Sequence, residues 1–111
     1  MRSGIPVRPW FKKVVDNTVH QVSSTPVYVD RIIWHNDDGA ARFMQIFNKA
    51  SADVILATTV PDLVMQLGAD STETFPFGDV LWGIGFSFAI TTTRDGSTTG
   101  TASDVMVGVS N

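Results

Sequence analysis

Hydrophobic and polar residues alternate with a period of two along much of the chain, most clearly in its last third. Over residues 84–91, large apolar side chains take every second position and small or polar ones take the others. A second alternating run covers residues 105–109, and a segment rich in Thr, Ser and Gly separates the two. Such alternation is typical of half-buried antiparallel strands, and we expect the two runs to pair across the long loop. The predicted buried face consists of Ile84, Phe86, Phe88 and Ile90, with Leu63, Met65 and Val107 among its neighbours.

Shorter runs with the same period precede this region. They predict strands at residues 14–22, 27–34, 42–48 and 60–67. Turn chemistry separates them, most clearly at Asp38-Gly39, a pair typical of hairpins. Residues 49–58 fit either a short strand or a helical turn, 69–73 are expected as loop, and 75–78 as an irregular segment. Short strands at this spacing predict an all-β fold, an antiparallel β-sandwich of jelly-roll type.

The composition fits one folded domain and narrows the function classes. A chain of 111 residues with 43% hydrophobic residues suits a single core and excludes a disordered protein. The net charge of −3 argues against nucleic-acid binding, and the absence of cysteine excludes disulfides and thiolate zinc sites. No apolar run approaches the roughly 18 residues of a membrane span, and the N-terminus lacks the apolar stretch of a secretory signal.

The first 13 residues differ in charge from the rest of the chain. They contain four basic residues and no acid, whereas the other 98 carry four bases against eleven acids, a net charge of −7. Pro6 and Pro9 favour an extended, unpaired backbone. A loose terminus and a docking arm both fit, and two adjacent aromatic residues favour docking. We therefore predict an extended arm at 1–13 and a sandwich domain at 14–111. The residues predicted to bind a neighbouring chain are Arg2, Arg8, Trp10, Phe11, Lys12 and Lys13.

Several strands, notably residues 27–34, carry apolar side chains on both faces. One small sandwich has a single core and cannot bury both faces of every strand, so we interpret the excess as a subunit interface. The predicted interface residues are Tyr28, Ile32, Trp34, Phe43 and Phe47.

Candidate chemistry is sparse. His35 with Asp37 and Asp38 is the one cluster that resembles a metal site, but residues of this kind are common in turns because they satisfy local backbone groups. No cysteine nucleophile, Gly-x-Ser-x-Gly elbow or phosphate-binding glycine loop occurs, so we expect no enzyme, no metal and no cofactor. Tyr28, Trp34 and Trp82 could form a sugar-stacking platform, although core or interface packing is the favoured interpretation.

Four motifs carry a resemblance to a known family. They are FNKASA at 47–52, TVP at 59–61, WGIGFSFAITT at 82–92 and DVMV at 104–107. Residues 34–111 thereby resemble the small β-sandwich head proteins of tailed bacteriophages that serve as capsid decoration or cement proteins. The resemblance implies a structural virion protein on the outer surface of the capsid, a homotrimer that binds the major capsid protein. The alternative is a carbohydrate-binding β-sandwich module of a phage fibre or lectin, with Trp34 or Trp82 as its platform.

Overall fold

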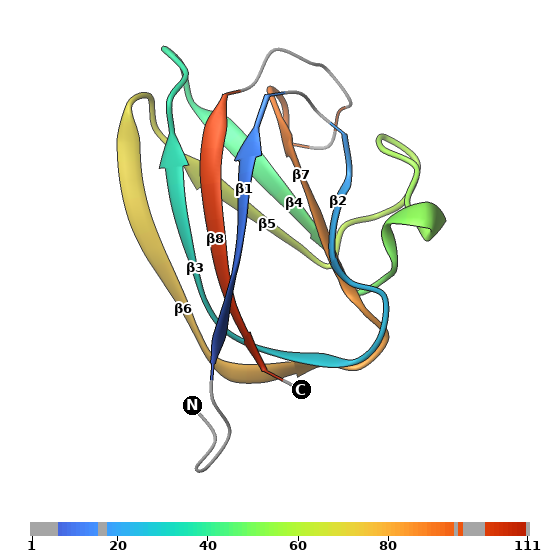
Figure 1. The fold of residues 1–111 in the computed structure, drawn as a ribbon. Helices are drawn as coiled ribbons and strands as arrows, with labels where there is room; N and C mark the ends of the chain where they lie inside the picture. Colours follow the sequence, from blue (N-terminus) through green and yellow to red (C-terminus); the bar gives the residue numbers. More distant parts are fainter. Residues whose placement is uncertain (1–6, 16–17, 95, 97–101, 111) are drawn as a thin grey trace.

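The computed structural model describes residues 7–15, 18–94, 96 and 102–110, which form two packed antiparallel sheets (Figure 1). Sheet A has the strand order β1-β8-β3-β6, and sheet B has the order β2-β7-β4-β5. The strands are β1 (Arg8–Val14), β2 (His20–Ser23), β3 (Val27–Asn36), β4 (Arg42–Phe47), β5 (Leu63–Leu67), β6 (Ser71–Trp82), β7 (Phe86–Thr91) and β8 (Ser103–Ser110). A single 3₁₀ turn, η1 (Ser51–Asp53), lies between β4 and β5.

The strand pairing identifies the fold as a jelly roll. β1 pairs with β8, β2 with β7, β3 with β6 and β4 with β5, all antiparallel. The chain is therefore one long antiparallel ribbon that is rolled up, so that its strand pairs alternate between the two sheets. Two four-stranded sheets connected in this way define the jelly roll. The predicted all-β sandwich of jelly-roll type is confirmed.

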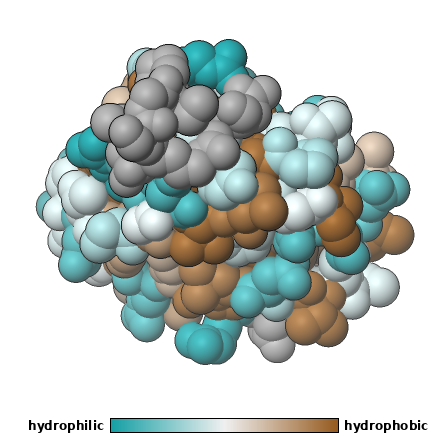
Figure 2. Space-filling model, turned by 90° about the horizontal axis from the view of Figure 1, so that it is seen from below, coloured by the Kyte–Doolittle hydropathy of each residue, from teal (hydrophilic) through white to brown (hydrophobic). Residues whose placement is uncertain are grey.

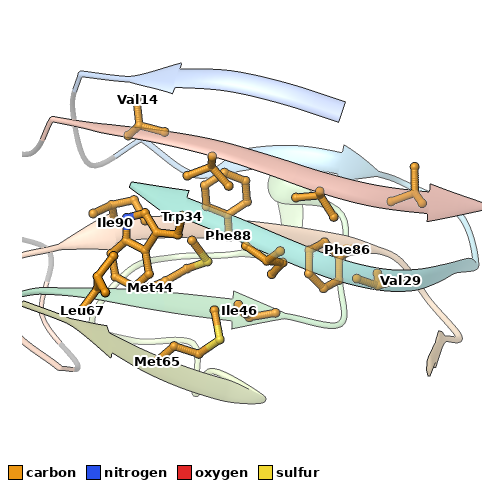
Figure 3. Packing of buried hydrophobic residues seen from close by; sticks show 14 of the residues in the cluster. Val14, Val29, Trp34, Met44, Ile46, Met65, Leu67, Phe86, Phe88 and Ile90 are labelled. Carbon is orange, nitrogen blue, oxygen red and sulfur yellow. The ribbon is translucent and has the colours of Figure 1, made fainter. Parts of the chain in front are cut away.

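The core lies between the two sheets and is built from the inward side of each alternating strand (Figure 3). Its largest fully buried side chains are Trp34, Phe47, Phe86 and Phe88, of which Phe47 lies outside the cluster between the sheets. The indole Nε1 of Trp34 donates a hydrogen bond to the Ser103 Oγ at 3.0 Å, which satisfies the one polar atom of that ring. The buried positions predicted at Phe86, Phe88, Ile90, Met65 and Val107 are confirmed.

Two predicted core residues lie at the surface instead. Ile84 is 60% exposed and Leu63 is 38% exposed. Ile84 belongs to the turn between β6 and β7, where the Asn48 Oδ1 accepts hydrogen bonds from the backbone N–H groups of Ile84 and Gly85. This turn ends the alternation, so strand β7 begins at Phe86. Leu63 is the first residue of β5, at the edge of sheet B.

Strand β6 is the element that the sequence did not predict. Residues 69–78 were expected as loop and irregular segment, yet Ser71–Trp82 is the longest strand and pairs with β3 along its length. A bulge sets residues 77–79 opposite the single residue Asp30, and Gly78 and Asp79 adopt positive φ angles of 70° and 66° there. Pro76 is tolerated because β6 lies at the edge of sheet A.

The last two strands do not pair with each other, contrary to the sequence prediction. β7 lies in sheet B between β2 and β4, whereas β8 lies in sheet A between β1 and β3. β7 and β8 therefore do not form a hairpin. Both strands are central, as their burial requires, but in different layers.

The predicted arm is wrong for the part of it that the structure describes. Residues 8–13 do not leave the sandwich, because Arg8–Val14 forms β1 and pairs with β8 in continuous register. The side chains of Trp10 and Val14 point inward and join the core, and Pro9, which lacks a backbone N–H, is tolerated because β1 is an edge strand. The sandwich therefore includes residues assigned to the arm, while residues 1–6, with Arg2, lie outside the described part.

Candidate interaction surface

Three of the five residues predicted at a subunit interface are fully buried within the chain itself. Ile32 and Trp34 point into the core from β3, and Phe47 has no exposed surface on β4. These assignments are wrong, because a residue without exposed surface cannot contact a neighbouring chain. Tyr28 and Phe43 are half-buried and retain some accessible surface.

Sheet B is covered on its outer face by the protein's own segments. Ser87, Ala89 and Thr91 point away from the core on β7 and yet have no exposed surface. Gln45 donates through its Nε2 to the Thr91 Oγ1 at 3.1 Å and to the Gly96 carbonyl at 2.9 Å, and the Ser87 Oγ donates to the Lys49 carbonyl at 2.9 Å. The segments after β4 and β7 therefore lie over this face, which explains why Phe47 is buried.

One end of the sandwich is exposed and apolar. The strand registers place the β2–β3, β4–β5 and β6–β7 connections together at this end, with the start of β1 and the end of β8. Among the described residues, six of the eight large hydrophobic side chains that are exposed belong to it. We call these six the apolar end: Ile55, Val60, Leu63, Val80, Leu81 and Ile84. Figure 2 views the molecule from this side, and apolar atoms occupy the centre of the face between polar ones.

Side-chain hydrogen bonds hold the loops of the apolar end in place. Asn48 joins two of them: its Oδ1 accepts from Ile84 and Gly85, and its own backbone N–H donates to the Asp62 Oδ2 at 2.6 Å. Within the β4–β5 connection, the Thr59 Oγ1 accepts from the backbone N–H of Ile55 at 2.9 Å. Ile55 and Ile84 are therefore presented on connections whose backbones are fixed by hydrogen bonds, while Leu63, Val80 and Leu81 lie on strands β5 and β6.

The aromatic residues considered for sugar stacking do not form an open platform. Trp34 is fully buried. Trp82 is half-buried, stacks on Phe77 at a ring-centroid distance of 6.1 Å and meets the edge of Phe86 at 4.8 Å. The rings of Phe77 and Phe86 thus cover part of the Trp82 indole, and the prediction that Trp34 could serve as a platform is wrong.

The basic residues predicted to bind a partner are exposed on β1. Arg8, Lys12 and Lys13 are all exposed, and Phe11 is 65% exposed beside them. Lys13 lies 3.6 Å from Asp104 on the neighbouring strand β8. Trp10 differs from this group, because its ring packs edge-on against the core residue Phe88 at 5.5 Å. Trp10 is therefore part of the sandwich and cannot fill a partner's pocket as we expected.

The His35 cluster holds loops together. The His35 Nδ1 lies 2.6 Å from the Thr72 Oγ1, and its Nε2 lies 3.7 Å from Asp37. The Asp38 Oδ2 lies 3.1 Å from the Arg42 Nε and accepts from the backbone N–H of Ala102 at 2.8 Å. Among the described residues, no group of side chains could hold a metal ion, and these residues form no pocket. In the same residues, no helix has the length and apolar character needed to cross a membrane.

Comparison with known proteins shows a distant structural likeness. No family model matches the chain, and no curated protein matches it. Among solved structures, the chain is similar to the coat protein of Tobacco streak virus, with 10% sequence identity and a TM-score of 0.42. The alignment covers 100% of this chain and 90% of that one. The assignment of the jelly-roll fold rests on the strand order described above.

Proposed function

We propose that this protein is a structural component of a virus particle that decorates the capsid of a tailed bacteriophage and cements its outer surface. In this role it binds the major capsid protein and copies of itself, and it acts without catalysis or a cofactor. The sequence motifs that resemble phage decoration proteins support the proposal, and the jelly roll is a fold that recurs in viral capsid proteins. Because one fold serves many functions, the proposal depends on a surface feature rather than on the fold.

The apolar end is the observation that carries the proposal. Exposed apolar side chains that gather at one end of a protein mark a site of association, and here they lie on strand ends and on connections that hydrogen bonds hold in place. A rigid apolar surface loses little conformational entropy on docking, which favours a stable attachment to a shell. We therefore assign the apolar end as the surface that faces the capsid.

The carbohydrate-binding alternative gains no comparable support. It requires an indole with an open face, and Trp34 has none while Trp82 is packed against Phe77 and Phe86. The capsid role is the function that the surface supports best.

Quantitative mass spectrometry and electron microscopy of the purified particle test this proposal. The protein should be present in a fixed number of copies per particle, at symmetric positions on the outer shell. Replacing Ile84 or Leu81 by Asp should abolish its attachment to undecorated shells in a sedimentation assay. The matched control is Gln66→Asp, which introduces the same charge at an exposed position of β5 outside the apolar end and should leave attachment unchanged. Absence of the protein from particles, or full attachment of Ile84→Asp and Leu81→Asp, would contradict the proposal.

A further inference from the structure

The two edges of sheet A carry opposite charge. β1 forms one edge and contains three basic residues and no acid, whereas β6 forms the other and contains two acids and no base. Lys12 on β1 and Glu73 on β6 are both exposed, and neither makes an ion pair within the described part of the chain. Each copy of the protein therefore has a basic edge and an acidic edge on opposite sides of one sheet.

The strand registers place Lys12 and Glu73 at the same level along the strand direction of sheet A. Following the pairing across sheet A, Lys12 lies opposite Val105, Val105 opposite Trp34, and Trp34 opposite Glu73. The row beside it connects Phe11 with Thr74 in the same way. A second copy set beside the first without a shift along the strands would bring its Lys12 next to the first copy's Glu73.

The directions of the edge strands also fit such an arrangement. Each neighbouring pair in the order β1-β8-β3-β6 is antiparallel, so the two edges of this four-stranded sheet run in opposite directions. Two copies in the same orientation therefore place β6 of one antiparallel to β1 of the other, which is the commoner pairing of strands.

Two prolines indicate that side chains, rather than a continuous backbone ladder, make this contact. Pro9 on β1 and Pro76 on β6 occupy the same row of sheet A, opposite Gly108 and Arg31 of the inner strands. Proline has no backbone N–H and protects an edge strand from indiscriminate pairing. Specificity between the edges must then come from side chains, and the matched pair is Lys12 with Glu73, three residues along each strand from the prolines.

We propose that copies of this protein associate side by side, with the basic β1 edge of one copy against the acidic β6 edge of the next. The contact is heterologous, because two different surfaces meet, and repetition closes a ring or extends a chain. This inference deepens the self-association in the proposed function, but it depends only on sheet A and not on a capsid. It also assigns the exposed residues Phe11 and Lys12 to a sister subunit.

Cysteine cross-linking of the isolated protein tests the contact directly, because the chain contains no cysteine of its own. The variant Phe11→Cys/Thr74→Cys leaves Lys12 and Glu73 in place. Within one copy, these positions are three strand spacings apart, about 14 Å, which is beyond the reach of a disulfide. We expect disulfide-linked dimers and larger species on mild oxidation. Each single variant, and the control pair Phe11→Cys/Ala52→Cys with an exposed partner position outside sheet A, should give little product.

Charge reversal then shows whether the ion pair directs the contact. In the Phe11→Cys/Thr74→Cys background, Glu73→Lys should lower the cross-linked fraction roughly fivefold at low salt, because like charges then face each other. Adding Lys12→Glu restores opposite charges and should restore the product. The proposal is wrong if the double-cysteine variant forms no more product than the control pair, if Phe11→Cys alone dimerises as well, or if Glu73→Lys has no effect. These results test the contact between copies alone, and the contact of the apolar end with a capsid is measured separately with the apolar-end variants.

Discussion

Replacement of Asn36 should reveal how much stability one buried amide supplies to the end of the sandwich opposite the apolar end. Asn36 is the last residue of β3 and has no exposed surface. Its Nδ2 lies within hydrogen-bond distance of the carbonyl oxygens of Ala40 (3.0 Å), Leu67 (3.2 Å) and Gly68 (3.0 Å). Its Oδ1 accepts from the backbone N–H of Asp38 at 3.0 Å. One side chain thus ties the β3–β4 turn to the β5–β6 turn.

The magnitude follows from counting the groups that lose a partner. The amide has two N–H hydrogens, so three carbonyl contacts amount to about two donated bonds, and Asp38 adds an accepted one. A typical hydrogen bond contributes about 0.5–1.5 kcal/mol net, and a buried group left unsatisfied costs about 1–3 kcal/mol. Some of these groups are only partly buried and can find water, so we expect Asn36→Ala to lower the free energy of unfolding by about 2–4 kcal/mol.

The isosteric variant separates hydrogen bonding from packing. Asn36→Asp keeps the size of the side chain and the contact with Asp38, but it turns a carboxylate oxygen toward three carbonyl oxygens. We expect it to be at least as destabilising as Asn36→Ala at pH 7, because the buried charge then has one donor, the Asp38 N–H, and faces three carbonyl oxygens. Urea unfolding followed by circular dichroism measures both variants, and Asp37→Ala, an exposed neighbour, should stay within about 0.5 kcal/mol of wild type. If Asn36→Asp is as stable as wild type, the reasoning from hydrogen bonds is wrong.

Two further predictions use pairs of positions that look alike in the sequence but differ in the structure. Phe88→Ala should cost about 3–5 kcal/mol in urea unfolding because the ring is fully buried, whereas Ile84→Ala should stay within about 0.5 kcal/mol; equal losses would place both residues in the core. Gly85→Ala should lower the thermal midpoint because its Cβ would lie 2.9 Å from the Ser23 carbonyl oxygen, whereas Gly83→Ala, with open space around it, should not. Equal midpoints for the two glycine variants in scanning calorimetry would refute the close approach.

Alternation predicted the strands whose two faces meet different environments. β3, β7 and β8 are inner strands of their sheets, and Trp34, Phe88 and Val107 are among their inward residues. Apolar residues recur at every second position of these strands because one face of each packs on the core. β6 escaped prediction because it is an edge strand that contains a proline and a bulge, and its pairing with β3 stabilises it without strict alternation. The choice of partner strand was equally hidden, since nothing in the pattern of residues 84–109 shows that β7 and β8 belong to different sheets.

Only part of the candidate interaction surface could be predicted from the sequence. Alternation shows that a strand such as β4 has two apolar faces, but it does not show what covers each of them. Phe47 is covered by its own chain, because the segments after β4 and β7 fold over sheet B. The apolar end was missed because Ile55 and Ile84 lie in connections, where periodicity carries no information about burial. The exposed basic residues of β1 were found, since clustered charge is visible in the sequence whatever its secondary structure.

The two proposed contacts use different parts of the sandwich and are geometrically compatible. The inner strands β4 and β7 of sheet B are covered on their outer face by segments of the same chain, whereas both edges of sheet A and the apolar end are exposed. Association of the β1 edge with the β6 edge places successive copies in a row perpendicular to the strands. The strands of every copy then point in the same direction. All apolar ends in such an assembly would then point toward the same side. A group of copies could therefore meet one shell through several apolar ends at once, so that the weak contacts between edges would strengthen attachment through multivalency rather than through their own affinity.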